Sequence, residues 1–142
     1  MNNLVRLNEY AVLNKDNPIG YTYDISTCIA MLNHRENSAI LSHIESNNDD
    51  NDINLQLMLE ILNLDDDKII YTELFTGTNT NQYNLHLVKN ILHNNRYLFE
   101  VKSSFIDLFN QGSIGYNYNT NDYYLVDTNY DLQSVNVLKK TL

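Results

Sequence analysis

The chain alternates short apolar and polar stretches, and in only two places does the apolar spacing lengthen to that of a helix. Period-two alternation and short unbroken apolar runs are typical of strands. By this criterion, strands are predicted at residues 4–7, 9–13, 19–25, 29–32, 38–44, 68–75, 96–105, 114–118, 123–126 and 132–138. Turn chemistry separates many of them, as in 14–18 with the single proline, 33–37 and 119–122.

Two helices are predicted where apolar residues recur every three or four positions. The first follows a cap at Asn51 or Asp52 and ends near Leu64, and the second follows a cap within 79–81 and ends near Asn94. The expected fold class is therefore α+β, layered, with a mostly antiparallel or mixed β core and two helices packed on it. No repeat or interdomain linker is apparent, so residues 1–142 are expected to form one domain.

Composition narrows the classes of function. Nine Lys and Arg stand against eighteen Asp and Glu, and the resulting charge of −9 argues against sequence-independent binding to nucleic acid. No segment approaches the roughly twenty apolar residues that span a bilayer, so no membrane insertion is expected. Neither end has a basic stretch leading into an apolar run, and the single cysteine forms no internal disulfide.

That cysteine supplies the candidate chemistry. Cys28 follows the polar step Ser26-Thr27, lies between two apolar runs, and precedes His43 by fifteen residues. A thiol needs a nearby base to become a nucleophile at neutral pH, and two adjacent strands joined by a loop of that length could place these side chains side by side. The same pattern fits a small buried packing cysteine and a hydrogen-bonded core histidine, so these interpretations stay open.

The flanking segments carry a family resemblance. They are Asn8-Glu-Tyr-Ala-Val12, Thr22 six residues before the cysteine, Ile25-Ser-Thr-Cys28-Ile-Ala-Met31 and Ala39-Ile-Leu-Ser-His43-Ile44. In order and spacing they resemble the amino-terminal half of the chemoreceptor glutamine deamidases, the CheD family. The chain departs from the family at Ser26-Thr27, where those enzymes have Gly-Ser. The Cys-His site is also similar to that of bacterial toxins that deamidate host glutamines, including the cytotoxic necrotizing factor catalytic domains.

The resemblance implies a CheD-like protein-glutamine deamidase without a metal or other cofactor. Cys28 would attack the side-chain amide to form a thioester, His43 would act as base and acid, and Thr22 would orient the His43 ring. Backbone N–H groups at Cys28 or just before it, at Ser26 and Thr27, would hold the oxyanion.

The implied partner is a protein with an exposed glutamine. It would be a chemoreceptor for a cytoplasmic enzyme, or a host protein for an effector secreted without a recognisable signal peptide. Two alternatives remain: transglutamination, in which an amine replaces water at the thioester, and a non-catalytic binding module that uses its acidic surface. The sequence leaves the oligomeric state open.

Other side chains give weaker signals. His34, His86 and His93 lack the paired spacing of a metal site and are expected to be solvent-exposed. The alternating tyrosines of the predicted hairpin form two faces, one expected in the core and one a candidate contact surface for a protein partner; they are Tyr116, Tyr118, Tyr123 and Tyr124.

Overall fold

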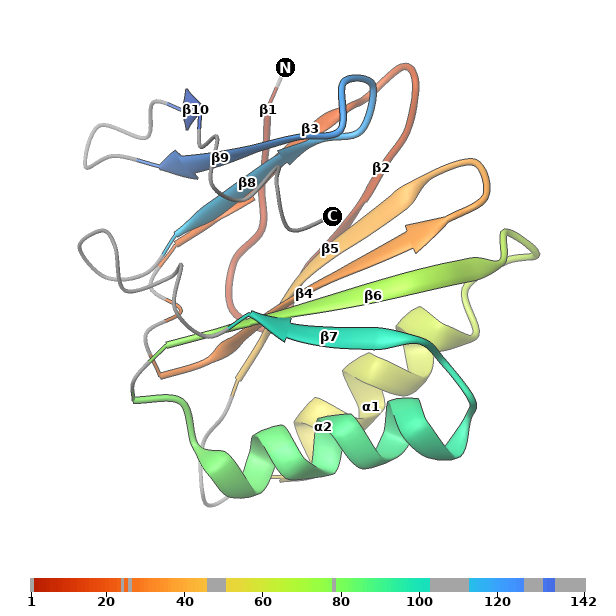
Figure 1. Ribbon diagram of the computed structural model, residues 1–142, viewed down its shortest axis with the longest axis vertical. Helices are drawn as coiled ribbons and strands as arrows, with labels where there is room; N and C mark the ends of the chain where they lie inside the picture. Colours follow the sequence, from red (N-terminus) through yellow and green to blue (C-terminus); the bar gives the residue numbers. More distant parts are fainter. Residues whose placement is uncertain are drawn as a thin grey trace.

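The strands pair into two sheets, as the computed structural model shows for residues 2–23, 25, 27–45, 51–77, 79–102, 113–126 and 132–134 (Figure 1). Sheet A has the order β1 (Asn2–Leu4), β3 (Ile19–Thr22), β8 (Ile114–Asn117), β9 (Asp122–Val126) and β10 (Leu132–Ser134). Sheet B has the order β2 (Tyr10–Leu13), β5 (Ala39–Ile44), β4 (Ile29–Arg35), β6 (Ile69–Thr76) and β7 (Phe99–Lys102). The pairs β1–β3 and β6–β7 are parallel, and the other neighbours in these two sheets are antiparallel.

Two helices cover the face of sheet B that points away from sheet A (Figure 1). They are α1 (Asn51–Leu62) and α2 (Gln82–Asn94). The cap of α2 is Asn81, whose side chain accepts a hydrogen bond from the Asn84 N–H. Both predicted helices and the α+β class with a mostly β core are thus confirmed. Neither helix is long and apolar enough to cross a membrane, in the part of the chain that the structure describes.

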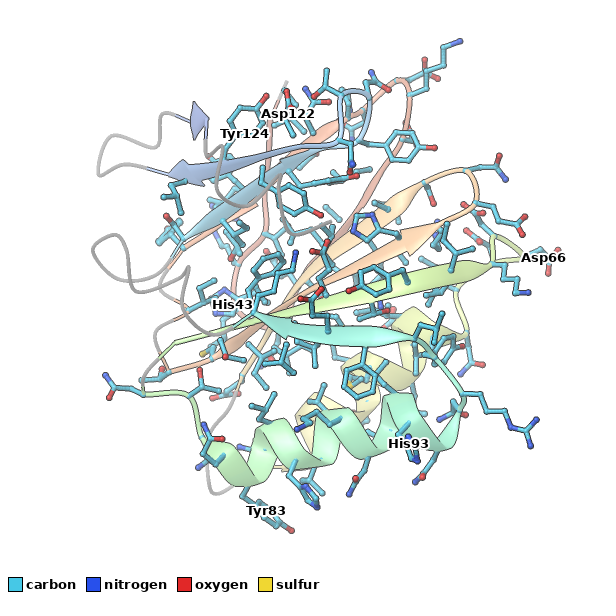
Figure 2. All side chains as sticks on the ribbon, in the orientation of Figure 1. His43, Asp66, Tyr83, His93, Asp122 and Tyr124 are labelled. Carbon is cyan, nitrogen blue, oxygen red and sulfur yellow. The ribbon has the colours of Figure 1, made fainter. Side chains whose placement is uncertain are left out.

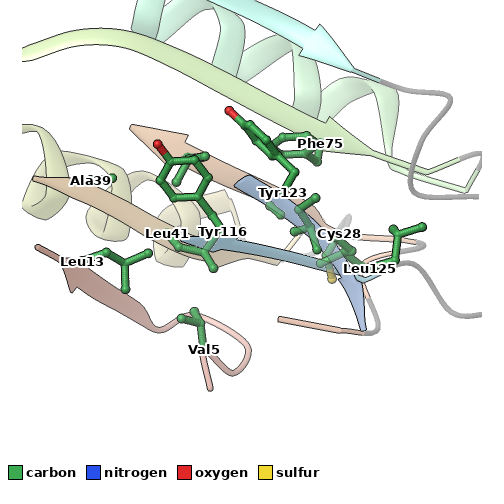
Figure 3. Packing of buried hydrophobic residues seen from close by; sticks show 13 residues of the cluster. Val5, Leu13, Cys28, Ala39, Leu41, Phe75, Tyr116, Tyr123 and Leu125 are labelled. Carbon is green, nitrogen blue, oxygen red and sulfur yellow. The ribbon is translucent and has the colours of Figure 1, made fainter. Parts of the chain in front are cut away.

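Sheet B is buried on both faces, which explains its nearly unbroken apolar strands. Successive side chains of a strand point to opposite faces. In β4, Ile29 and Met31 accordingly pack toward the helices, whereas Ala30 and Leu32 pack toward sheet A. The cluster between the two sheets also includes Cys28, Phe75, Tyr116 and Tyr123 (Figure 3).

Several predicted boundaries were wrong. Strand β3 ends at Thr22, and β4 continues to Arg35, three residues into the predicted turn at 33–37. The strand continues because its polar side chains find partners on β6: Asn33 Nδ2 donates to Thr72 Oγ1 at 2.9 Å. The first strand ends at Leu4, and β7 begins only at Phe99. The ends of two predicted strands, 103–105 and 135–138, lie outside the described residues.

Candidate active site

A histidine and a threonine from different sheets meet at one end of the sandwich. Thr22 is the last residue of β3 in sheet A, and His43 is the next-to-last residue of β5 in sheet B. The distance from Thr22 Oγ1 to His43 Nδ1 is 2.8 Å, and both residues are buried. Figure 2 shows His43 between the two sheets. This contact, expected from the family resemblance, is therefore present.

Cys28 and His43 face the same side of sheet B. Ala30 of β4 lies directly opposite His43, and Cys28, just before β4, belongs with Ala30 to the apolar cluster between the sheets. Cys28 and His43 line one pocket of about 350 Å³, together with Val5, Arg6, Leu7 and Tyr23.

The hydrogen bonds of Thr22 determine which nitrogen of His43 carries the proton. The Thr22 hydroxyl donates its single hydrogen to the Val5 carbonyl oxygen, at 2.7 Å. Thr22 Oγ1 must then accept from His43, so Nδ1 is the protonated nitrogen and Nε2 carries the lone pair. Nε2 is buried and has no hydrogen-bond partner among the described residues. The ring is thus held as a neutral base with its basic nitrogen unused.

Burial keeps that base neutral. His43 is only 4% exposed, and removal from water disfavours the imidazolium, lowering the pKa of His43 from 6.5 to about 4. At neutral pH the ring is therefore unprotonated at Nε2.

Cys28 lies in a bend just before β4 and is 9% exposed. The Thr27 hydroxyl lies 3.8 Å from Cys28 Sγ, within hydrogen-bonding range of sulfur. The Cys28 N–H donates to the Ile25 carbonyl at 3.1 Å, so this amide is already engaged by the bend itself. Of the predicted oxyanion residues, Thr27 is exposed beside the sulfur and Ser26 lies outside the described residues.

A second polar cluster, which the sequence did not predict, lies between the two sheets. Glu73 of β6 is fully buried between the sheets, where His34 Nε2 and Lys102 Nζ each approach one of its carboxylate oxygens at 2.5 Å. The Tyr123 hydroxyl donates to the same carboxylate from sheet A. His86 and His93 are exposed as predicted, but the prediction that His34 is exposed was wrong, because it packs against Glu73 with a side chain that is 16% exposed.

The charges of this cluster are fixed by the hydrogen bonds. Burial alone would raise the pKa of Glu73, but hydrogen bonds from its three neighbours outweigh burial and lower the pKa below its usual value. Burial and the adjacent Glu73 carboxylate raise the pKa of Tyr123, which stays protonated and able to donate. The sequence did contain a signal for this cluster. Glu73 and Phe75 are two residues apart in a predicted strand, so the acidic side chain is expected on the same face as the apolar one, toward the core.

Among the described residues, no three histidine, cysteine, aspartate or glutamate side chains are grouped closely enough to hold a metal ion. The chain matches no protein-family model and no curated protein at a significant level. Any functional assignment therefore depends on the chemistry of the site itself.

Proposed function

We propose that this protein is a cysteine-dependent protein-glutamine deamidase, with Cys28 as nucleophile, His43 as acid and base, and Thr22 as the residue that orients the His43 ring. The observation that carries the proposal is the unpartnered Nε2 lone pair of His43, buried in the pocket that Cys28 also lines. An unused buried acceptor is unfavourable for stability, and a free base in a pocket that a thiol also lines is what nucleophilic catalysis uses.

The reaction divides a difficult hydrolysis into two steps. His43 Nε2 takes the Cys28 proton as sulfur attacks the amide carbon, and then gives that proton to the departing ammonia, which leaves a thioester on Cys28. In the second step Nε2 takes a proton from water, and the hydroxide attacks the thioester. The proton returns to the sulfur, and the product is a glutamate side chain. The hydrogen bond that His43 Nδ1–H donates to Thr22 Oγ1 keeps the Nε2 lone pair available in both steps.

The oxyanion of each step needs donors near the sulfur. Because the Cys28 N–H already donates to Ile25, the proposal assigns this role to Ser26 and Thr27, with the Thr27 hydroxyl also close enough to stabilise the thiolate. Loss of one such donor typically lowers kcat by about a hundredfold or more.

The test is ammonia release from a chemoreceptor cytoplasmic domain and from glutamine-containing peptides, with conversion of glutamine to glutamate followed by mass spectrometry. We expect activity in the native protein, and a loss of about a thousandfold or more in Cys28→Ala and His43→Ala. The matched control is His86→Ala, an exposed histidine of α2, which should keep full activity. Undiminished ammonia release by Cys28→Ala contradicts the proposal, as does a native protein that releases none.

A non-catalytic binding module is the second candidate, favoured by the 9% exposure of Cys28 and its place in the apolar cluster between the sheets. Iodoacetamide labelling separates the two. The deamidase proposal predicts that Cys28 at neutral pH reacts faster than an unperturbed thiol, and that His43→Ala removes the acceleration. Equal labelling rates in the two proteins favour the packing role of the thiol.

A further inference from the structure

We infer that the turn Arg6–Glu9 selects glutamines that have an acidic neighbour, with the Arg6 guanidinium binding the neighbour's carboxylate. The inference rests on the proposed deamidase function and names a feature of its substrate. Four observations support it: the place of the turn in the pocket wall, its internal hydrogen bonds, its attachment to β5, and its charge.

The turn forms one wall of the pocket that holds the reactive groups. Arg6 and Leu7 line this pocket together with Cys28 and His43. Arg6 and Leu7 are both exposed to solvent. An extended peptide advances about 3.3 Å per residue. A glutamine side chain inserted toward Cys28 therefore brings the residues one or two positions away onto the Arg6–Leu7 wall.

Hydrogen bonds within the turn fix its shape. The Glu9 N–H donates to the Arg6 carbonyl at 3.0 Å, and the Arg6 N–H donates to Glu9 Oε1 at 2.9 Å. Asn8 has φ of 59°, the left-handed conformation that asparagine tolerates better than most residues. The turn is thus closed by its own residues before any substrate arrives.

The same turn is fastened to the strand that carries the base. The Asn8 N–H donates to the His43 carbonyl at 2.7 Å, and the His43 N–H donates to the Glu9 carbonyl at 3.1 Å. The side chains of Asn8 and Glu45 are also bonded, with Asn8 Nδ2 donating to Glu45 Oε2 at 3.0 Å. The backbone of Arg6 is therefore held at a fixed position relative to His43, so its side chain starts from a defined place in the pocket wall.

Charge identifies what the wall binds. Arg6 is the only arginine, lysine, aspartate or glutamate among the pocket-lining residues that the structure describes, and His43 is neutral at neutral pH. No described carboxylate lies within ion-pair distance of its guanidinium, although the chain has a net charge of −9. Glu9, the acid nearest in sequence, already accepts from the Arg6 backbone. A lone cation at the mouth of this pocket attracts a carboxylate and repels lysine, while Leu7 offers apolar contact to the methylene groups of the substrate.

The test uses blocked pentapeptides with a central glutamine and alanine elsewhere, except for one Asp, Asn or Lys placed one or two positions to either side. Ammonia release gives kcat/KM for each peptide. We expect a two- to fivefold preference for Asp over Asn at the favoured position, the range typical of an exposed charge pair, and its disappearance in about 0.5 M NaCl. Arg6→Glu should invert the preference to Lys over Asp without abolishing ammonia release. The matched control, Lys89→Glu on the exposed face of α2, makes the same charge change and should keep the native order.

The outcomes separate the two claims. Equal rates on Asp and Asn peptides, or a preference that survives Arg6→Glu, overturn the inference and leave the deamidase proposal standing. If the native protein releases no ammonia from any peptide or from a chemoreceptor domain, both claims fail together.

Discussion

Acid should destabilise this fold in a pH range set by one buried side chain, His43. In the unfolded chain the imidazole takes up a proton near its ordinary pKa of 6.5, whereas in the folded protein burial lowers the pKa to about 4. Between these values the unfolded state binds more protons than the folded state. The free energy of unfolding must therefore fall as the pH falls through this range, and level off with respect to His43 below about pH 4.

The magnitude follows from the size of the pKa difference. At roughly 1.4 kcal/mol per pH unit, lowering the pKa from 6.5 to about 4 corresponds to about 3 kcal/mol in total. About 2 kcal/mol of this is lost between pH 7 and pH 5, a range that avoids protonating Glu73, whose pKa is lowered below its usual value of 4.5. A loss of that size is a substantial part of the 5 to 15 kcal/mol that stabilises an ordinary domain.

Urea unfolding followed by circular dichroism, at several pH values from about 7 to about 5, measures this effect. We expect His43→Gln to lose most of the pH dependence, because glutamine does not titrate. His86→Gln, an exposed position on α2, is the control and should retain it. If the native protein and His43→Gln show the same slope, or if the His43 ring signals in an NMR titration move near pH 6.5, the reasoning about burial is refuted.

Two further variants test the contacts of the two polar clusters. Thr22→Val removes the acceptor of His43 Nδ1–H and the donor to Val5, leaving two buried groups unpaired. It should lower the free energy of unfolding by about 2 to 6 kcal/mol and strongly reduce kcat. Thr22→Ser keeps the hydroxyl and should retain most of the stability and most of kcat. Equal effects of the two substitutions would contradict the orienting role. Glu73→Gln leaves the buried Lys102 ammonium without its carboxylate. It should lower the free energy of unfolding, measured with urea, by about 3 to 5 kcal/mol. A variant as stable as the native protein would show that the ion pair is dispensable.

Local patterns explain the part of the fold that the sequence predicted. The spacing of apolar residues in α1 and α2, the Asn81 cap and the β8–β9 hairpin all depend on residues close together in the chain. Cys28 and His43 line the same pocket because β4, which follows the bend at Cys28, pairs with β5. The fifteen-residue spacing predicted that the two side chains could lie side by side, and that contact stays a prediction.

Long-range pairing explains the errors. Residues 33–37 have the composition of a turn, yet β4 continues to Arg35 because β6 supplies partners that are 39 residues away in the chain for both Asn33 and His34. The buried polar cluster around Glu73 requires residues from both sheets, and no local window of sequence contains them all.

The chain's own periodicity determined which segments become strands and helices, and which faces of those elements are apolar, because hydrophobic burial acts through local spacing. Only the tertiary structure decided which nitrogen of His43 is basic, since that depends on Thr22 of the opposite sheet, whose hydroxyl donates to the Val5 carbonyl and therefore accepts from His43 Nδ1. It alone also placed Arg6 in the pocket wall. The sequence specifies which side chains are present, but the protonation state of a site residue and the residues that surround it depend on how the two sheets pack together.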